Sequence, residues 1–342
     1  MKNINKKFNI NYNKPPLIIA EISGNHAGNK KRFLDLIKRA FICGADLVKI
    51  QTYEPVDITL NMKSKKFRIT SGTWKNKYLW DLYREACTPF KWHSDAFKIA
   101  KKFKKKIFSS PFSLRAVDLL EKLKCPIYKI ASFEITDFKL INYIASKKKK
   151  IIISTGMSTI SEIKNALKII NKYHNNVVIL HCVSDYPTKI RNSNLEKILY
   201  LKKIFSKNEI GLSDHTNGIS TSLIASNFGI SYIEKHFNLD NLKTTDSSFS
   251  INPEQLEELS ESFKYMFGKY KEKNSIRKKN FFLRRSIFST KDIKKNEKIT
   301  TENINTLRPK IGICASQYFK VIGKKTKRNI KANEPIFANY LL

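Results

Sequence analysis

The sequence lacks the features that stabilise small secreted domains or anchor a chain in a membrane. It has only five cysteines in 342 residues, and none forms a CxxC pair, which argues against a disulfide framework and a structural zinc site. No run of about 20 apolar residues occurs, so we expect no transmembrane helix. The N-terminal segment is basic but has no apolar stretch of the kind a secretory signal needs. We therefore expect a cytoplasmic protein.

Acidic residues and arginine are both scarce compared with lysine. The chain has 65 basic against 29 acidic residues, a net charge of +36, and only 11 of the basic residues are arginine. Such a charge is typical of nucleic-acid-binding proteins, but these rely on arginine to read phosphates and bases. We therefore expect no nucleic-acid partner and small anionic substrates instead. The motifs GxGxxG and GxxxxGK[ST] are also absent, which argues against a dinucleotide site or a P-loop.

Eight short apolar segments alternate with segments of helical periodicity. The expected strands are residues 17–23, 46–52, 106–112, 126–132, 150–155, 177–182, 209–214 and 231–237. The expected helices are residues 31–43, 113–123, 137–146, 159–173, 194–205, 218–228 and 253–268. Continuous apolar strands indicate a parallel sheet that is buried on both faces. Eight such units predict an α/β fold, a (β/α)8 TIM barrel followed by a small β-rich C-terminal domain.

Two segments depart from the strand–helix alternation. An insertion over residues 54–92, which carries Trp74 and Trp80, follows the second strand; long loops in compact domains are usually functional, and this one belongs at the rim of a barrel. The segment after residue 268 is polar and highly charged. We predict a barrel domain over residues 1–270, a linker over 271–283 and a small domain over 284–342.

Polar side chains occur at the carboxyl ends of nearly all the expected strands. They are Glu21, Lys49, Gln51, Ser110, Lys129, Ser132, Ser154, Ser213, His215, Glu234 and His236. Charged side chains are rarely buried without partners. In a barrel, the carboxyl ends of the strands meet at one mouth, where active sites lie. The pattern therefore predicts an enzyme with its site at that mouth.

Two groups of these residues indicate specific chemistry. His215 and His236 end neighbouring strands, about 4.8 Å apart, and could converge on one divalent cation acting as a Lewis acid. Mn²⁺ is our first expectation, with Mg²⁺ or Co²⁺ possible. Lys49 and Lys129, flanked by serines, favour binding of a small phosphorylated carboxylate. A Schiff-base lysine, as in barrel aldolases, is the competing interpretation.

Eight ordered motifs carry a resemblance to a known family. They are AEISGNHAG, VKIQTY, FSSPFSLRAVDLLEKL, YKIASFEITD, IIISTGMS, ILHCVSDYP, GLSDHTNGI and IEKHFNLD. Together they resemble the sialic acid synthase family, and the tail from Arg284 resembles that family's C-terminal SAF (antifreeze-like) domain. Within the family, the segments KIQTYEPVDITL and GTWKNKYLWDLYREACTPFKWH look most like the pseudaminic acid synthases.

The resemblance implies a transferase that condenses phosphoenolpyruvate with 2,4-diacetamido-2,4,6-trideoxy-L-altrose and water. The products would be pseudaminate and phosphate, released by C–O cleavage. N-acetylneuraminate and legionaminate synthases are the alternatives within the family. A non-catalytic basic binding protein is a distant alternative, as is the Schiff-base aldolase.

The resemblance also implies roles for individual residues. His215 and His236 resemble catalytic metal ligands, the ion polarising the sugar aldehyde, and Glu134 resembles the carboxylate beside the cationic carbon of the reaction. Phosphoenolpyruvate would be held by Lys49, Lys129, Ser110, Ser132, Ser154 and Ser213. The sugar would contact Glu21, Gln51, Tyr186 and Asp246. Arg308, with Phe288 beside it, resembles the arginine that reaches a partner's site, which implies a domain-swapped homodimer.

The chain departs from many relatives in two places. It has Ala27 between His26 and Gly28, and Thr244-Thr245 before Asp246. These differences bear on the loop shape at Asp246 and on the choice of sugar.

Overall fold

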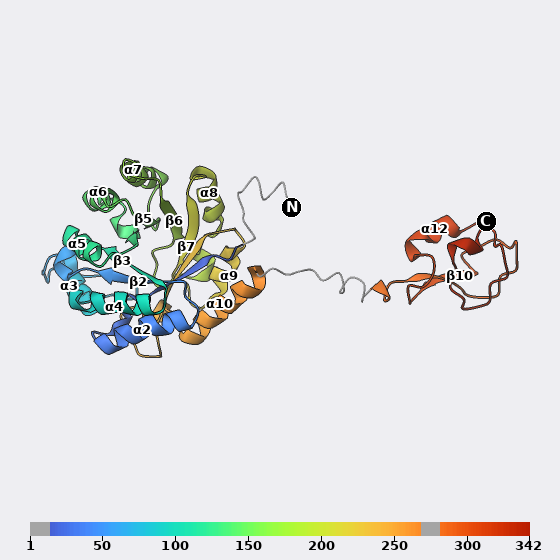
Figure 1. The fold of residues 1–342 in the computed structure, drawn as a ribbon, viewed down its shortest axis with the longest axis horizontal. Helices are drawn as coiled ribbons and strands as arrows, with labels where there is room; N and C mark the ends of the chain where they lie inside the picture. The colour runs from blue at the N-terminus through green and yellow to red at the C-terminus, as the bar shows by residue number, and fades with distance from the viewer. Residues whose placement is uncertain (1–13, 268–280) are drawn as a thin grey trace. The chain divides into compact units, whose positions relative to one another are not determined.

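Eight parallel strands form a closed barrel in the computed structural model, which describes residues 14–267 and 281–342 (Figure 1). The strands are β1 (Leu17–Glu21), β2 (Leu47–Thr52), β3 (Lys106–Pro111), β4 (Ile127–Ile130), β5 (Lys150–Ser154), β6 (Val177–Cys182), β7 (Glu209–Asp214) and β8 (Tyr232–His236). The barrel closes because β1 pairs with both β2 and β8. Nearly every strand residue is buried, which explains the continuous apolar runs. The predicted fold class is confirmed.

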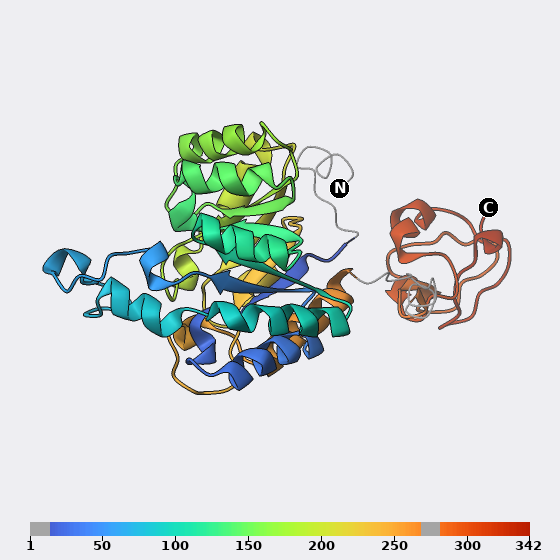
Figure 2. The same cartoon turned by 60° about the vertical axis from the view of Figure 1, so that its left-hand side comes forward.

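Helices surround the strands, as both views of the ribbon show (Figures 1 and 2). They are α2 (Lys30–Ile42), α3 (Leu79–Ala86), α4 (Phe90–Lys102), α5 (Leu114–Lys122), α6 (Phe138–Ser146), α7 (Ile160–Ile170), α8 (Glu196–Ile204), α9 (Ser220–Ser226) and α10 (Pro253–Phe267). Side-chain caps fix several of their starting points. Ser113 accepts from the backbone N–H of Ala116, and Thr159 forms a capping box with Glu162. Each such cap stabilises its helix by about 1 kcal/mol.

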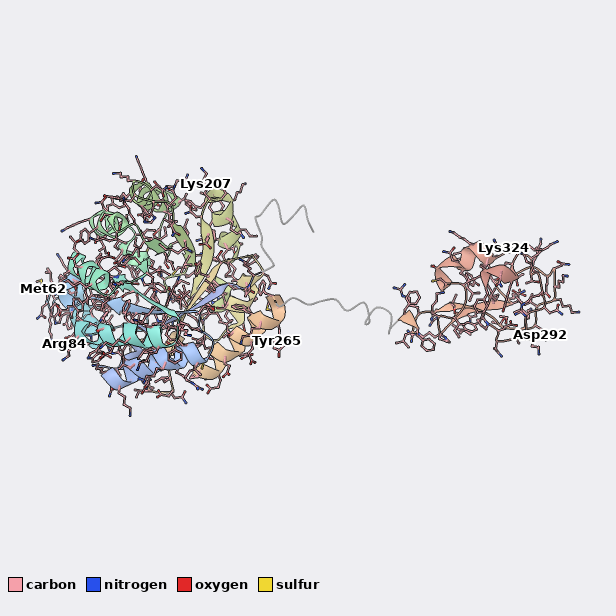
Figure 3. All side chains as sticks on the ribbon, in the orientation of Figure 1. Met62, Arg84, Lys207, Tyr265, Asp292 and Lys324 are labelled. Carbon is pink, nitrogen blue, oxygen red and sulfur yellow. The ribbon has the colours of Figure 1, made fainter. Side chains whose placement is uncertain are left out.

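The insertion after β2 contains more regular structure than the sequence predicts. It includes the short 3-10 helices η2 (Pro55–Asp57) and η3 (Lys65–Phe67), then α3 and the start of α4. In Figure 2 this segment, in light blue, projects from one end of the barrel unit. Met62, labelled in Figure 3, is one of its exposed apolar side chains.

The chain divides into two compact units, Met1–Gly268 and Lys269–Leu342. In the C-terminal unit β9 (Ser286–Ser289) pairs antiparallel with β10 (Ile304–Leu307), accompanied by the short helices η7 (Ala315–Gln317), α12 (Tyr318–Val321) and η8 (Ala338–Tyr340). This unit has its own apolar core, built around Ile287, Ile299 and Ile336. Most of the predicted linker, residues 271–280, lies outside the described residues.

The helices in the described ranges include none that combines the length and the apolar character needed to cross a membrane.

Candidate active site

A cavity of about 350 Å³ opens at the carboxyl ends of the barrel strands. The predicted residues that line it are Lys49, Gln51, Ser110, Lys129, Ser132, Glu134, Ser154, Tyr186, Ser213, His215, His236 and Asp246. Glu21 is fully buried beneath them. The structure therefore brings together, at one mouth, side chains from β1 to β8 that are far apart in the sequence.

The two lysines are paired with buried carboxylates. Lys49 Nζ lies 2.8 Å from Glu234 Oε1 and 3.3 Å from Glu21 Oε2. Lys129 Nζ lies 3.1 Å from the same Glu234 oxygen, which also accepts a hydrogen bond from Ser213 Oγ. We call this group, with Ser110, Ser132, Ser154 and Ser213, the charged floor. The predicted cationic patch is thus a compact mixed-charge cluster.

Burial and pairing set the protonation of the charged floor. Burial, opposed by Lys49, raises the pKa of Glu21 to about 7. Burial also lowers the pKa of Lys129 to about 8. Burial would raise the pKa of Glu234, but the ammonium groups of Lys129 and Lys49 outweigh it and lower that pKa. At neutral pH the floor therefore combines the ammonium groups of the two lysines with an ionised Glu234 and a partly protonated Glu21.

Unpartnered polar atoms concentrate at this site. Within the described residues, the buried side-chain atoms that lack both a hydrogen-bond partner and a close ion pair include Ser110 Oγ, Glu134 Oε2, Ser154 Oγ, His236 Nδ1 and His174 Nε2. All but the last belong to predicted site residues. Because leaving a buried polar group unpaired costs about 1–3 kcal/mol, such groups usually find partners. Their convergence on one cavity indicates a site built for a polar ligand.

His215 and His236 face each other with ring centroids 5.4 Å apart. His215 Nδ1 lies 2.9 Å from the carbonyl oxygen of Val183, so Nδ1 carries a proton, and in the neutral ring Nε2 keeps its lone pair. Burial lowers the pKa of His236 well below its usual value, and its unpartnered Nδ1 lies 3.7 Å from Asp246 Oδ2. Burial would lower the pKa of His215, but Cys182 and the Val183 carbonyl outweigh it and raise that pKa. In their neutral forms the two imidazoles would offer lone pairs that fit a divalent cation.

The histidine pair would supply only part of a coordination shell. Among the residues described, no group of three or more histidine, cysteine and acidic side chains is arranged to hold a metal. An ion at this pair would therefore complete its shell with water or substrate oxygens, as open catalytic sites do.

A hairpin from the insertion lies over the mouth. We call residues 68–78 the tongue: Ile69 N–H donates to Lys77 O, and Asn76 N–H donates to Ile69 O, both at 2.9 Å. Near its tip, Trp74 Nε1 donates to Thr245 O at 2.8 Å, and Thr73 Oγ1 donates to Tyr186 O. The tongue is thereby tied to the loops that follow β6 and β8. The prediction that the insertion sits at the pocket rim is confirmed.

The segments that carry the two sequence departures are joined by a hydrogen bond between Thr244 and Asn25. Asn25 is fully buried, and its Nδ2 donates to Phe237 O and Ser250 Oγ, both at 2.8 Å. Thr244 Oγ1 donates to Asn25 Oδ1 at 2.6 Å. His26 packs against Phe33 and Trp92 in the core. The loop before Asp246 is therefore held by a network that both altered segments share.

Arg308 and Phe288 belong to the C-terminal unit. Arg308 is exposed, whereas Phe288 on β9 is buried within that unit. Their contact with a partner's substrate stays a prediction.

Several residues of the cavity have no predicted role. They are Ser23, Tyr53, Ile58, Ile69, Trp74, Leu79, Leu82, Tyr83, Ala86, Phe112, Ala131, Phe133, Cys182, Glu234, Thr245 and Phe249. Glu234 has a signal in the sequence, because a carboxylate within a buried strand requires a partner. Of the others, Cys182 ends β6, and the rest lie on loops or on short helices outside the repeated strand–helix units, whose positions depend on tertiary contacts.

Comparisons with known proteins agree with this geometry. A sequence model of the NeuB family matches residues 36–274, and a model of the SAF domain matches residues 284–342. The pseudaminic acid synthase of Helicobacter pylori is 41% identical over 336 residues, covering 95% of this chain and 97% of that protein. An N,N'-diacetyllegionaminic acid synthase of Campylobacter jejuni is 37% identical over 333 residues, covering 94% and 99%.

A solved structure gives the same result at the level of the fold. The crystal structure of an N-acetylneuraminic acid synthetase from Leptospira borgpetersenii, in complex with citrate, superposes with a TM-score of 0.68 at 28% identity. The match covers 78% of this chain and 90% of that one.

Proposed function

Because the chain belongs to the NeuB family and ends in a SAF domain, we propose that it condenses phosphoenolpyruvate with 2,4-diacetamido-2,4,6-trideoxy-L-altrose and water, giving pseudaminate and phosphate. The two relatives described above are sugar acid synthases, and the chain is an enzyme of that kind. The choice of sugar rests on the 41% identity to a pseudaminic acid synthase across almost the whole of both chains.

The observation that carries the proposal is the set of unpartnered buried atoms around the charged floor. The hydroxyls of Ser110 and Ser154 have no hydrogen-bond partner, and both belong to a floor that carries two ammonium groups. A phosphate and a carboxylate on one small molecule would satisfy these hydroxyls and pair with the floor's ammonium groups. Phosphoenolpyruvate has both groups.

The histidine pair would lie above this floor. A divalent cation, for which Mn²⁺ is our first candidate, would be held by His215 and His236 and would act as a Lewis acid on the sugar carbonyl. Removal of divalent cations by a chelator should abolish activity, and Mn²⁺ should restore it.

The residues of the pocket would act by positioning and by charge. Lys49, Lys129 and the serines hold phosphoenolpyruvate so that its C3 carbon faces the aldehyde carbon of the sugar, and a new C–C bond forms between them. Positive charge then develops at C2. The buried carboxylate of Glu134 stabilises that charge and orients the water that adds there. Phosphate leaves the resulting tetrahedral carbon by C–O cleavage. Such preorganised electrostatics needs no covalent link to the protein.

A phosphate-release assay with phosphoenolpyruvate and the L-altro sugar tests this function directly. We expect release only when both substrates are present. In water labelled with oxygen-18, the label should enter C2 of the sugar acid and not the phosphate. Label in the phosphate would rule out C–O cleavage.

Legionaminate or N-acetylneuraminate synthesis is the second candidate, favoured by the 37% identity to a legionaminic acid synthase. The same assay with the legionaminate precursor and with N-acetylmannosamine separates the three reactions, since only the true substrate should give rapid release.

A Schiff-base aldolase requires a neutral lysine. The lowered pKa of Lys129, about 8, would assist that chemistry, but its ammonium group contacts the ionised Glu234 at 3.1 Å, which favours the charged form. Borohydride with pyruvate should therefore leave the protein unmodified, and a trapped lysine would contradict the synthase mechanism.

We also propose a domain-swapped homodimer in which Arg308, with Phe288 beside it, acts in the partner's site. The support is the SAF domain match over residues 284–342 together with the exposure of Arg308.

A further inference from the structure

The cavity has two chemically different sides. The charged floor provides ammonium and hydroxyl groups, whereas the insertion provides mainly aliphatic side chains, together with Trp74 and Tyr83. Ile58, Ile69, Leu79 and Leu82 all line the cavity, and we call them the apolar wall. Their side chains offer no hydrogen-bond donor or acceptor. Ile58, Ile69 and Leu79 are only partly buried, so a bound ligand would cover surface that is exposed in the free protein.

The apolar wall is held in place from several directions. Ile69 sits in the tongue, whose hairpin hydrogen bonds fix its backbone. Leu79 and Leu82 lie on α3, and Leu82 is buried. Near the tip of the tongue, the one donor of the Trp74 ring is already used on Thr245 O at 2.8 Å. The wall is therefore held in place, and the Trp74 ring next to it has no free hydrogen-bond donor.

The tongue is also linked to the proposed reaction centre through aromatic contacts. The Trp74 and Tyr186 rings lie 5.3 Å apart, and the Tyr186 ring lies 4.3 Å from that of His215. Phe249 lies 4.8 Å from His236 and 6.1 Å from Trp74. A sugar whose carbonyl lies at the histidines would therefore extend its far end past these rings toward the insertion.

We propose that the apolar wall determines substrate choice by accepting sugars that present a methyl group where ordinary hexoses present a hydroxyl. This inference rests on the proposed function of the cavity. It identifies the part of the protein that contacts the end of the sugar opposite the carbonyl. A hydroxyl placed against the wall would lose its water without gaining a partner, whereas a methyl group gains apolar contact. The substrate class is therefore the 6-deoxy acetamido sugars.

The first test compares two sugars that differ at one atom. Phosphate release is measured with 2,4-diacetamido-2,4,6-trideoxy-L-altrose and with its 6-hydroxy analogue. The wild-type kcat/KM should favour the 6-deoxy sugar by about 10- to 200-fold, the range that one such group supports in an apolar pocket. Equal kcat/KM for the two sugars would overturn the proposal.

Variants with a matched control assign the effect to the wall. Ile69→Thr replaces the ethyl branch of a wall side chain by a hydroxyl and keeps it β-branched, and Leu79→Asn tests a second position on α3. Val56→Thr makes a similar change in the same insertion at a residue that is 64% exposed and does not line the cavity. Ile69→Thr or Leu79→Asn should lower the 6-deoxy preference at least about 5-fold, while Val56→Thr should leave it unchanged. An unchanged preference in both wall variants would show that the apolar wall does not determine it.

The design separates this inference from the proposed function. The D-manno isomers of both sugars are run in parallel. Turnover confined to the D-manno series would refute the pseudaminate assignment, yet the 6-deoxy preference within that series would still support the wall. If no sugar releases phosphate, calorimetric titration of each pair decides the matter: tighter binding of the 6-deoxy sugars supports the wall, and equal or absent binding overturns it.

Discussion

The pKa of Glu134 should determine how the rate of the proposed reaction depends on pH. It lies on the 3-10 helix η4 (Ser132–Glu134) after β4, and one of its carboxylate oxygens is buried without a partner. Burial raises the pKa of this carboxyl to about 7. Since the proposed role requires the ionised form, kcat should rise with pH through about 7.

The variant Glu134→Gln should lose this rising limb and lower kcat by about 100-fold or more, the usual effect of removing one stabilising group in a preorganised site. A pH profile of phosphate release measures both effects. Glu54→Gln is the control, because Glu54 is an exposed carboxylate on the insertion that pairs with Arg115. A rising limb that persists in Glu134→Gln would assign the titration to another group.

A second prediction concerns the contribution of His93 to the free energy of unfolding. It lies on α4 with Nε2 2.8 Å from Thr52 Oγ1, and burial lowers its pKa from 6.5 to about 4. As pH falls, protons therefore bind the unfolded chain before the folded one. The stabilisation from neutral His93 is full above about pH 6.5 and is lost as the pH falls toward 4.

The variant His93→Gln keeps a polar group but does not titrate. Between pH 7 and pH 5 its free energy of unfolding should fall by about 2 kcal/mol less than that of the wild type, as measured by urea denaturation. His174→Gln, at a less buried position, should change the slope far less. Parallel pH dependences for wild type and His93→Gln would show that the pKa of this histidine is the same in the folded and unfolded states.

At the scale of the element, β7 and β8 are joined by a buried ion pair behind the two histidines. Lys235 Nζ lies 3.1 Å from Asp214 Oδ2, and both side chains are almost completely buried. Asp214 also accepts hydrogen bonds from Thr216 N–H and Ser222 Oγ, at 2.8 and 2.7 Å. Each member directly precedes a proposed metal ligand in the sequence, so this pair helps to fix the spacing of His215 and His236.

Removing one partner of this pair should leave the other charge buried and uncompensated. Lys235→Met should lower the free energy of unfolding by about 3–5 kcal/mol. The double variant Asp214→Asn/Lys235→Met should cost less than the sum of the single variants. Urea denaturation of all four proteins gives this double-mutant cycle, and strictly additive costs would show that the pair is not coupled.

The strands and most helices of the barrel could be predicted because burial imposes a clear pattern on them. The predicted helix at residues 113–123, for example, is α5 (Leu114–Lys122). Helix α4 (Phe90–Lys102) is not among the helices expected from the sequence, because the insertion is expected to extend to Trp92. Its buried face, with His93, Ala96 and Ile99 at spacings of three, was the available signal.

The candidate site also has one part that could be predicted from the sequence and one part that could not. Side chains at strand ends could be placed from the sequence, because parallel strands bring their carboxyl ends together. The apolar wall and Trp74 could not, because the path of the tongue depends on hydrogen bonds to Thr245 and Tyr186, more than 100 residues away. The pairing of both lysines with Glu234 also depends on the side-chain arrangement in three dimensions.

At the scale of the whole molecule, the two units have separate apolar cores with no residue in common. Activity in the proposed homodimer would need both, because His236 belongs to the barrel and Arg308 to the C-terminal unit. Subunit mixing can therefore reveal whether one chain completes the site of another.

The variants His236→Ala and Arg308→Ala should each be nearly inactive. When they are unfolded, mixed in equal amounts and refolded together, about one quarter of the wild-type activity should return, since half of the dimers are mixed and each has one complete site. Phosphate release measures this, with each variant refolded alone as the control. No recovery would indicate that Arg308 acts within its own chain or outside the site.

Because Trp74 is hydrogen-bonded to Thr245, its fluorescence can report the position of the tongue. The chain has three tryptophans: Trp74 touches the loop after β8, Trp80 lies on α3, and Trp92 is buried in the barrel core. Indole emission depends on the polarity around the ring. In a Trp80→Phe background, movement of the tongue would alter the signal of Trp74 while the signal of Trp92 stayed constant until the barrel unfolded. Opening of the mouth and loss of the fold could thus be followed separately, in one cuvette and without a label.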